Sequence, residues 1–147
     1  MSNVPATQVA PTPRFDATAP PAIAKLIGFQ LTKFCGGEAT VELNSGPQHY
    51  NPMGTVHGGV LCDIADAAMG MAFASTLDSD QSFTTLELKI NFLRPVWESH
   101  LHAKARVTSR GKTVGLVECD VIDGDGRLMA RASSTCLVLS GKMAEGR

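Results

Sequence analysis

The chain has 147 residues, of which 44% are hydrophobic and 18% charged, with a formal net charge of −1, and these values are ordinary for one globular domain. Such a nearly neutral chain lacks the positive charge with which proteins bind nucleic acids or anionic membranes, so we expect neither partner. The longest apolar run, residues 60–75, is interrupted by two aspartates, and no secretory signal is visible. The sequence therefore predicts a cytoplasmic protein without a membrane span.

The N-terminal segment, residues 1–22, is rich in Pro, Ala and Thr and is predicted to be an extended or disordered arm. A short helix is expected after Pro21, ending at Gly28. We place one domain at residues 23–140 and expect a frayed C-terminus at residues 141–147. The four cysteines show no CxxC spacing, so we expect neither a disulfide framework nor a cysteine metal site.

Alternating apolar and polar residues predict two strands, then one long helix, then four strands. Their expected ranges are 29–34, 39–43, 58–77 for the helix, 83–93, 101–109, 113–122 and 127–139. The turns between the last four are short, so we expect these strands to be antiparallel neighbours. The strand at 83–93 alternates cleanly, which places Thr85 on the same face as Glu87. One helix and one sheet predict an α+β fold in which a curved antiparallel sheet wraps the helix.

The long helix is apolar on nearly every side, which predicts that it is buried all round, yet it contains Asp63 and Asp66. A buried carboxylate without a partner is costly and its pKa rises. Each aspartate could instead cap a neighbouring group or face the rim of the domain. Two carboxylates in one such helix indicate that at least one of them is functional.

The helix begins at His57-Gly58-Gly59, where unpaired backbone N–H groups lie at the positive end of the helix dipole. Such N–H groups can polarise a carbonyl oxygen, although a glycine-rich helix entry alone is weak evidence. Gly58 and Asp66 are eight residues apart, or roughly 12 Å along a helix, so they cannot both touch one carbonyl. Two antiparallel copies of the helix across a two-fold axis would solve this, and a catalytic pair therefore requires an oligomer.

The pattern N-P-M-G-x-V-H-G-G-V-x-x-x-x-A-D at residues 51–66, followed by T-x-E-L-x-I-N-F-L-R-P at residues 85–95, resembles the hotdog-fold acyl-CoA thioesterases. The phenylacetic-acid-degradation (PaaI-like) branch is the most similar, and the resemblance covers residues 23–140. It implies a hotdog fold, a homodimer with a continuous sheet, often paired into a tetramer, and hydrolysis of an acyl-CoA to free acid and CoA. No cofactor is implied, because CoA is part of the substrate.

By position, the resemblance implies catalytic roles for Asp66, Gly58, Asn51, His57 and Thr85. Asp66 would act as general base or as nucleophile, and the Gly58 amide would polarise the thioester carbonyl. Asn51 and Thr85 would position the water or the leaving thiol. His57 would orient the Asn51 loop or donate to the thiolate, although a histidine at a helix start is as often a cap. Asp63 is the rival carboxylate and more plausibly supports the helix start.

Positive charge for the CoA phosphates is expected from Arg94 and from the turn formed by Arg110, Gly111, Lys112 and Thr113. The same turn could equally be a solvated hairpin. His49, His100 and His102 show no ligand spacing with a third metal-binding residue, so we expect no metal.

Two other functions use the same features. A hotdog-fold enoyl-CoA hydratase or dehydratase would employ the histidine and carboxylate on the acyl chain and release no thiol. A non-catalytic acyl-CoA-binding module would bind the thioester and leave it intact.

Overall fold

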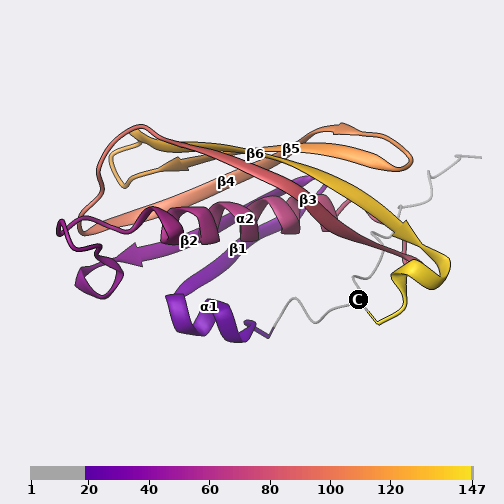
Figure 1. Ribbon diagram of the computed structural model, residues 1–147, viewed down its shortest axis with the longest axis horizontal. Helices are drawn as coiled ribbons and strands as arrows, with labels where there is room; N and C mark the ends of the chain where they lie inside the picture. Colours follow the sequence, from indigo (N-terminus) through magenta and orange to yellow (C-terminus); the bar gives the residue numbers. More distant parts are fainter. Residues whose placement is uncertain (1–18, 147) are drawn as a thin grey trace, which may run out of the picture.

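The computed structural model describes residues 19–146, in which one six-stranded antiparallel sheet curves around one long helix (Figure 1). The helices are α1 (Ala22–Ile27), α2 (Gly58–Ala74) and the short 3-10 helices η1 (Pro47–His49) and η2 (Gly141–Ala144). The strands are β1 (Phe29–Cys35), β2 (Glu38–Ser45), β3 (Gln81–Phe92), β4 (Ser99–Arg110), β5 (Val114–Ile122) and β6 (Leu128–Ser140). The predicted α+β architecture, with a central helix wrapped by a curved sheet, is confirmed.

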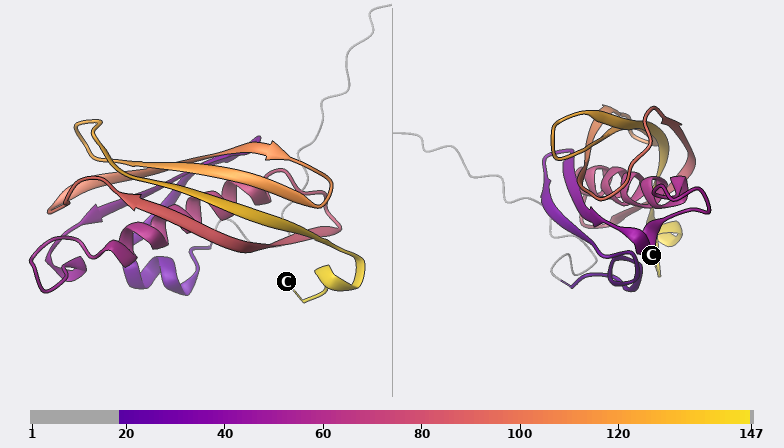
Figure 2. Two further views of the ribbon diagram at one scale, coloured as in Figure 1. Left: turned by 45° about the horizontal axis from the view of Figure 1, so that its top comes forward. Right: turned by 90° about the vertical axis from the view of Figure 1, so that its left-hand side faces the viewer.

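Helix α2 lies in the curve of the sheet, as the end-on view in Figure 2 shows. Its small and apolar side chains allow the backbone to approach the sheet closely, and Ile64, Ala68 and Phe73 are wholly buried there. Burying a side chain as large as Ile or Phe contributes roughly 1.5–3 kcal/mol. The core thus holds α2 in a fixed position relative to the strands.

The strand order is β1-β2-β4-β5-β6-β3, so the prediction that β3 and β4 are neighbours is wrong. Strand β3 instead pairs with β6 and lies at the edge of the sheet, while β4, β5 and β6 are neighbours as expected. The connection from β3 to β4 is not a hairpin, because β4 pairs with β2 and β5. Within this connection, the carbonyl of the buried Val96 accepts a hydrogen bond from the Val56 N–H in the loop before α2. The link between β3 and β4 therefore passes beside the start of α2.

A β-bulge at Leu86 interrupts β3, so the predicted clean alternation is also wrong. Thr85 lies opposite Cys136 and Glu87 lies opposite Thr135, which leaves Leu86 without an opposite residue. Cys136 is buried, whereas Glu87 accepts a hydrogen bond from Thr135 on the outer face. The bulge therefore turns Thr85 toward the helix side of the sheet, away from the face of Glu87.

Helix α2 is not buried all round in the single chain. Asp66 and Gly59 are exposed, and Cys62, Asp63 and Gly70 are half-buried. These five residues form one stripe at helical spacing, here called the open flank. A Cβ on Gly70 would lie 3.5 Å from Phe83 of β3, so the open flank runs beside the strand whose outer edge is unpaired within residues 19–146.

The chain ends differ in part from expectation. Helix α1 follows Pro21 and ends at Gly28, which has a positive φ of 92°, as predicted. Most of the predicted N-terminal arm, residues 1–18, lies outside the described residues. At the other end, residues 141–144 form η2 with Ala144 buried, rather than fraying. Among the described residues no helix is long and apolar enough to cross a membrane.

Candidate active site

The loop before α2 is held by Asn51. Its side-chain oxygen accepts hydrogen bonds from the N–H groups of Met53 (2.9 Å) and Thr55 (3.3 Å), and its amide nitrogen donates to Thr55 Oγ1 at 3.1 Å. Gly54, with φ of 80°, allows the chain to turn back within this loop. The Asn51 side chain thus braces the loop that leads into the helix, and its remaining amide hydrogen is its spare donor.

His57 is the N-cap of α2. Its Nδ1 accepts the Gly59 N–H at 2.8 Å, so the histidine caps the helix, as one of the two sequence interpretations had it. Gly58 is the first helical residue, where no intrahelical acceptor exists, and no carbonyl of the described residues receives its N–H. One N–H at the positive helix end is thereby left for a ligand.

Phe92 lies against Gly58, a contact that sequence reasoning missed. A Cβ on Gly58 would be 2.9 Å from Phe92 Cζ, so any larger residue at this position would push the phenyl ring aside. Phe92 as a whole residue is 55% exposed. Phe92 therefore forms an apolar wall beside the free N–H. The sequence feature that could have pointed to Phe92 is the strand motif at residues 85–95, which also contains Thr85.

Asp66 and Asp63 lie on the open flank, and neither carboxylate has a hydrogen-bond or ion-pair partner within residues 19–146. Burial raises the pKa of Asp66, and the charge of Asp63 raises it further. A raised pKa makes a carboxylate a better proton acceptor near neutral pH. Asp66 thus has the property that a general base needs, although its side chain is solvent-accessible in the single chain.

Thr85 reaches the same region from β3. Its Oγ1 lies 4.0 Å from Cys136 Sγ. Burial raises the pKa of that thiol, the contacts with Ser134 and Thr85 oppose this shift, and the charge of Asp66 adds to it. Thr85 therefore faces the side of the sheet on which α2, with Asp66, lies. Cys136 was not predicted, because only the register of β3 with β6 places it there.

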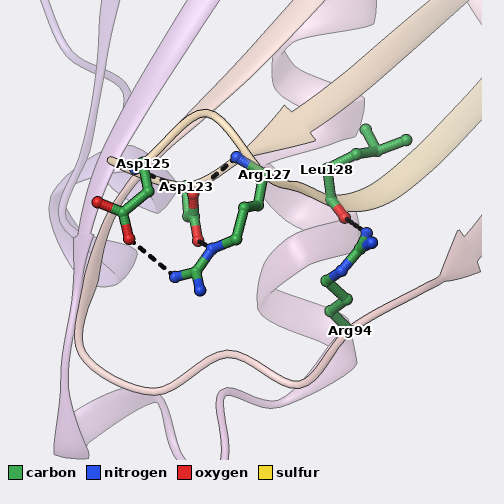
Figure 3. A network of polar contacts seen from close by, with 5 residues as sticks. All are labelled: Arg94, Asp123, Asp125, Arg127 and Leu128. Carbon is green, nitrogen blue, oxygen red and sulfur yellow. Dashed lines mark hydrogen bonds and ion pairs between the residues drawn. The ribbon is translucent and has the colours of Figure 1, made fainter.

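Arg94 lies at the helix-start end of the molecule, after β3 (Figure 3). Its Nη1 donates to the Leu128 carbonyl at 2.6 Å. The neighbouring Arg127 is ion-paired with Asp123 at 2.7 Å and with Asp125 at 2.9 Å, whereas no carboxylate among the described residues pairs with Arg94. The positive charge of Arg94 is therefore uncompensated and exposed.

Arg110, in contrast, lies at the other end of α2, and its guanidinium group is held by neighbouring side chains. Its guanidinium carbon lies 5.2 Å from the centroid of the Phe73 ring, and its nitrogens donate to Thr76 Oγ1 and Gln81 Oε1. Gly111, Lys112 and Thr113 follow it in an exposed turn. The segment after Arg94 lies beside the start of α2, where Val96 accepts the Val56 N–H, whereas Arg110 lies at the end of α2, so within one chain the two cannot hold the same phosphate.

The chain can be placed by comparison with known proteins. The sequence profile of the thioesterase superfamily matches residues 53–130, a span that includes Gly58, Asp66 and Thr85. A candidate esterase of Saccharolobus solfataricus is 31% identical over 121 residues, which cover 82% of this chain and 86% of the relative. This chain belongs to the thioesterase superfamily. Membership supports a hydrolase that acts on thioesters.

Two further comparisons agree. The structure of the Escherichia coli PaaI protein from the phenylacetic acid degradation operon superposes with a TM-score of 0.76 at 26% identity, covering 82% of this chain and 86% of that one. A Listeria monocytogenes protein named 1,4-dihydroxy-2-naphthoyl-CoA hydrolase is 25% identical and covers 79% of this chain and 94% of the relative. The predicted hotdog fold of the PaaI-like thioesterases is thus confirmed.

Proposed function

We propose that the protein is an acyl-CoA thioesterase whose active site combines Asp66 of one subunit with the Gly58 N–H of the partner subunit. The observation that carries this proposal is Asp66, an unpartnered carboxylate of raised pKa on the open flank beside the unpaired β3 edge. Both groups belong to α2, eight residues apart, so only a second copy can bring them to one thioester. If two β3 strands paired edge to edge, they would cover the unpaired β3 edge and the open flank of α2, and the protein would be at least a dimer.

The chemistry follows from these two groups. Asp66 takes a proton from a water molecule, and the water oxygen attacks the thioester carbonyl carbon. The carbonyl electrons move to its oxygen, where the Gly58 N–H donates a hydrogen bond that strengthens with the negative charge. The tetrahedral intermediate then breaks its C–S bond, and the Asp66 proton passes to the CoA thiolate. The products are a carboxylic acid and the CoA thiol.

The other site residues have supporting roles. Thr85, on the helix side of β3, positions the water. Asn51 and His57 hold the loop and the helix start so that the Gly58 N–H points at the carbonyl. Phe92 shields that N–H from water, which strengthens the hydrogen bond at the oxyanion.

For the coenzyme, we propose Arg94 and Lys112 as phosphate contacts, with Arg110, Gly111 and Thr113 shaping the turn that carries Lys112. Arg94 lies near the start of α2 and the turn with Lys112 lies near its end, but antiparallel packing of two α2 helices would bring the end of one subunit beside the start of its partner. The name of the Listeria relative specifies a CoA thioester, which supports CoA as the carrier.

The test is thiol release from a panel of aromatic, medium-chain and short-chain acyl-CoA substrates, with matched oxygen esters as controls. We expect stoichiometric free CoA and acid from at least one acyl-CoA. Consumption of an enoyl-CoA without thiol release would instead reveal a hydratase. Tight binding of acyl-CoA without turnover would reveal a binding module, and either result would overturn the proposal.

A further inference from the structure

Three potential metal ligands gather on the outer face of the sheet, away from α2. Glu42 of β2 lies opposite His102 of β4 in the strand register, and His100 is two residues before His102, so its side chain points to the same side. The intervening Leu43 and Leu101 are buried on the helix side. This cluster therefore lies on the opposite face of the sheet from the proposed active site.

The distances within the cluster suit a small divalent ion. His100 Nε2 lies 3.0 Å from Glu42 Oε2, and His102 Nδ1 lies 3.5 Å from Glu42 Oε1. The three ligand atoms all fall within 4.8 Å of one another. Tetrahedral zinc with bonds near 2.0–2.1 Å holds its ligand atoms about 3.4 Å apart, so small side-chain rotations would complete the geometry.

The orientation of the His100 ring also suits a metal ligand. Its Nδ1 lies 2.5 Å from Asn44 Oδ1, and this contact holds the ring with Nε2 toward Glu42. A divalent ion between this nitrogen and the carboxylate would balance the negative charge of Glu42. Among the described residues, no lysine or arginine is ion-paired with Glu42, whose only ion-pair partners are the two histidines.

Neighbouring residues orient the ligands as the outer shell of a metal site does. Thr32 Oγ1 donates to Glu42 Oε1 at 2.9 Å and fixes the carboxylate, while Asn44 fixes the His100 ring. The hydrogen bond from Thr32 also holds the pKa of Glu42 below its usual range. The side chains of His100 (42%), His102 (26%) and Glu42 (29%) remain partly exposed, so an ion can enter and water can complete its shell.

We propose that Glu42, His100 and His102 bind a late first-row divalent cation, with Zn²⁺ as the best match to two imidazoles and one carboxylate. This departs from the sequence expectation of no metal, because the third ligand comes from another strand and cannot be seen in the spacing of the histidines. The bound ion would link β2 to β4. It would also stabilise the native chain, since the unfolded chain does not hold the three ligands together. The site does not rest on the proposed function.

The experiment uses metal-free full-length protein carrying Cys35→Ser, because that exposed thiol is a competing zinc ligand. Titration with ZnCl₂ is followed by calorimetry and by thermal unfolding. We expect one Zn²⁺ per chain and a raised Tm. Glu42→Gln and His102→Gln should each lose both effects. Glu118→Gln, which removes the same charge from the same outer face, should keep both.

A second pair of variants tests the outer shell. Thr32→Val should weaken zinc affinity by about 10-fold, which is the smallest effect usual for loss of a residue that hydrogen-bonds to a metal ligand. Thr32→Ser keeps the hydroxyl and should restore the affinity. Unfolding without metal checks that each variant folds. The proposal is wrong if no saturable binding of one ion per chain occurs, or if Glu42→Gln binds Zn²⁺ as the parent does. A parent protein whose Tm responds to pH but not to Zn²⁺ would mean that the cluster holds only a proton.

Discussion

At the scale of single residues, the proposal depends on Asp66. Replacing it with Asn keeps the shape but removes the proton acceptor, so kcat for thiol release should fall by roughly 10²-fold or more, as expected for loss of a general base. Acyl-CoA binding should persist. Asp63→Asn is the matched control on the same flank and should retain most activity. The opposite pattern, with Asp63→Asn inactive and Asp66→Asn near normal, would show that the wrong carboxylate has been assigned.

The raised pKa of Asp66 also predicts how stability depends on pH. The folded chain holds this proton more tightly than the unfolded chain, whose aspartates titrate at about 3.9. The contribution is therefore complete below that pH and is lost as pH rises through the higher folded pKa. Asp66→Asn never ionises, so it should resist urea better than wild type at neutral pH, with the difference vanishing in acid. Equal stability at both pH values would contradict a raised pKa.

Two substitutions at Gly58 separate the role of its backbone N–H from the effect of crowding Phe92. Gly58→Pro removes the N–H at the first helical position, where proline fits and the extended His57 before it (φ −61°, ψ 133°) is compatible. Gly58→Ala crowds Phe92 in the same way but keeps the N–H. We expect kcat to drop by about 10²–10³-fold for Pro, the cost of one oxyanion donor, and much less for Ala. Similar losses in both variants would assign the effect to Phe92.

At the scale of elements, close packing of β5 on α2 depends on Gly115. A Cβ there would lie 2.3 Å from Phe73 Cε2 and 2.9 Å from the Ser109 carbonyl oxygen. Gly115→Ala should therefore destabilise the fold by about 1–3 kcal/mol, measured by urea unfolding. Gly124→Ala, whose Cβ would meet nothing closer than 3.8 Å, should cost far less. A neutral Gly115→Ala would mean that Phe73 moves away freely.

The elements themselves were largely predictable, because alternation and glycine turns are local signals. The motif from Asn51 to Asp66 likewise located the helix start and its carboxylate. The order of strands was not predictable, since the short link around Val96 resembles a hairpin connection. The bulge at Leu86 decides which face of the sheet Thr85 occupies, but the apolar and polar residues of β3 alternate in sequence without a break there. Contacts such as Thr85 with Cys136 exist only through strand register.

At the scale of the whole molecule, one chain leaves its β3 edge unpaired and the flank of α2 that carries Asp66 open. The sequence could indicate a two-fold partner only through the eight-residue separation of Gly58 and Asp66. The structure adds the place where that partner would fit, which is the unpaired β3 edge beside the open flank. Sequence reasoning also anticipated burial of the entire helix, and pairing of two chains would provide the missing cover.

Shared sites between subunits make a direct prediction for mixed dimers. Asp66→Asn and Gly58→Pro chains are each expected to be nearly inactive alone, yet a dimer of one with the other contains one site with both groups intact. After subunit exchange in equal amounts, half the dimers are mixed and thiol release should recover to about a quarter of wild type. If the mixture stays as inactive as its components although exchange is complete, each chain carries its own active site and the two-subunit account is wrong.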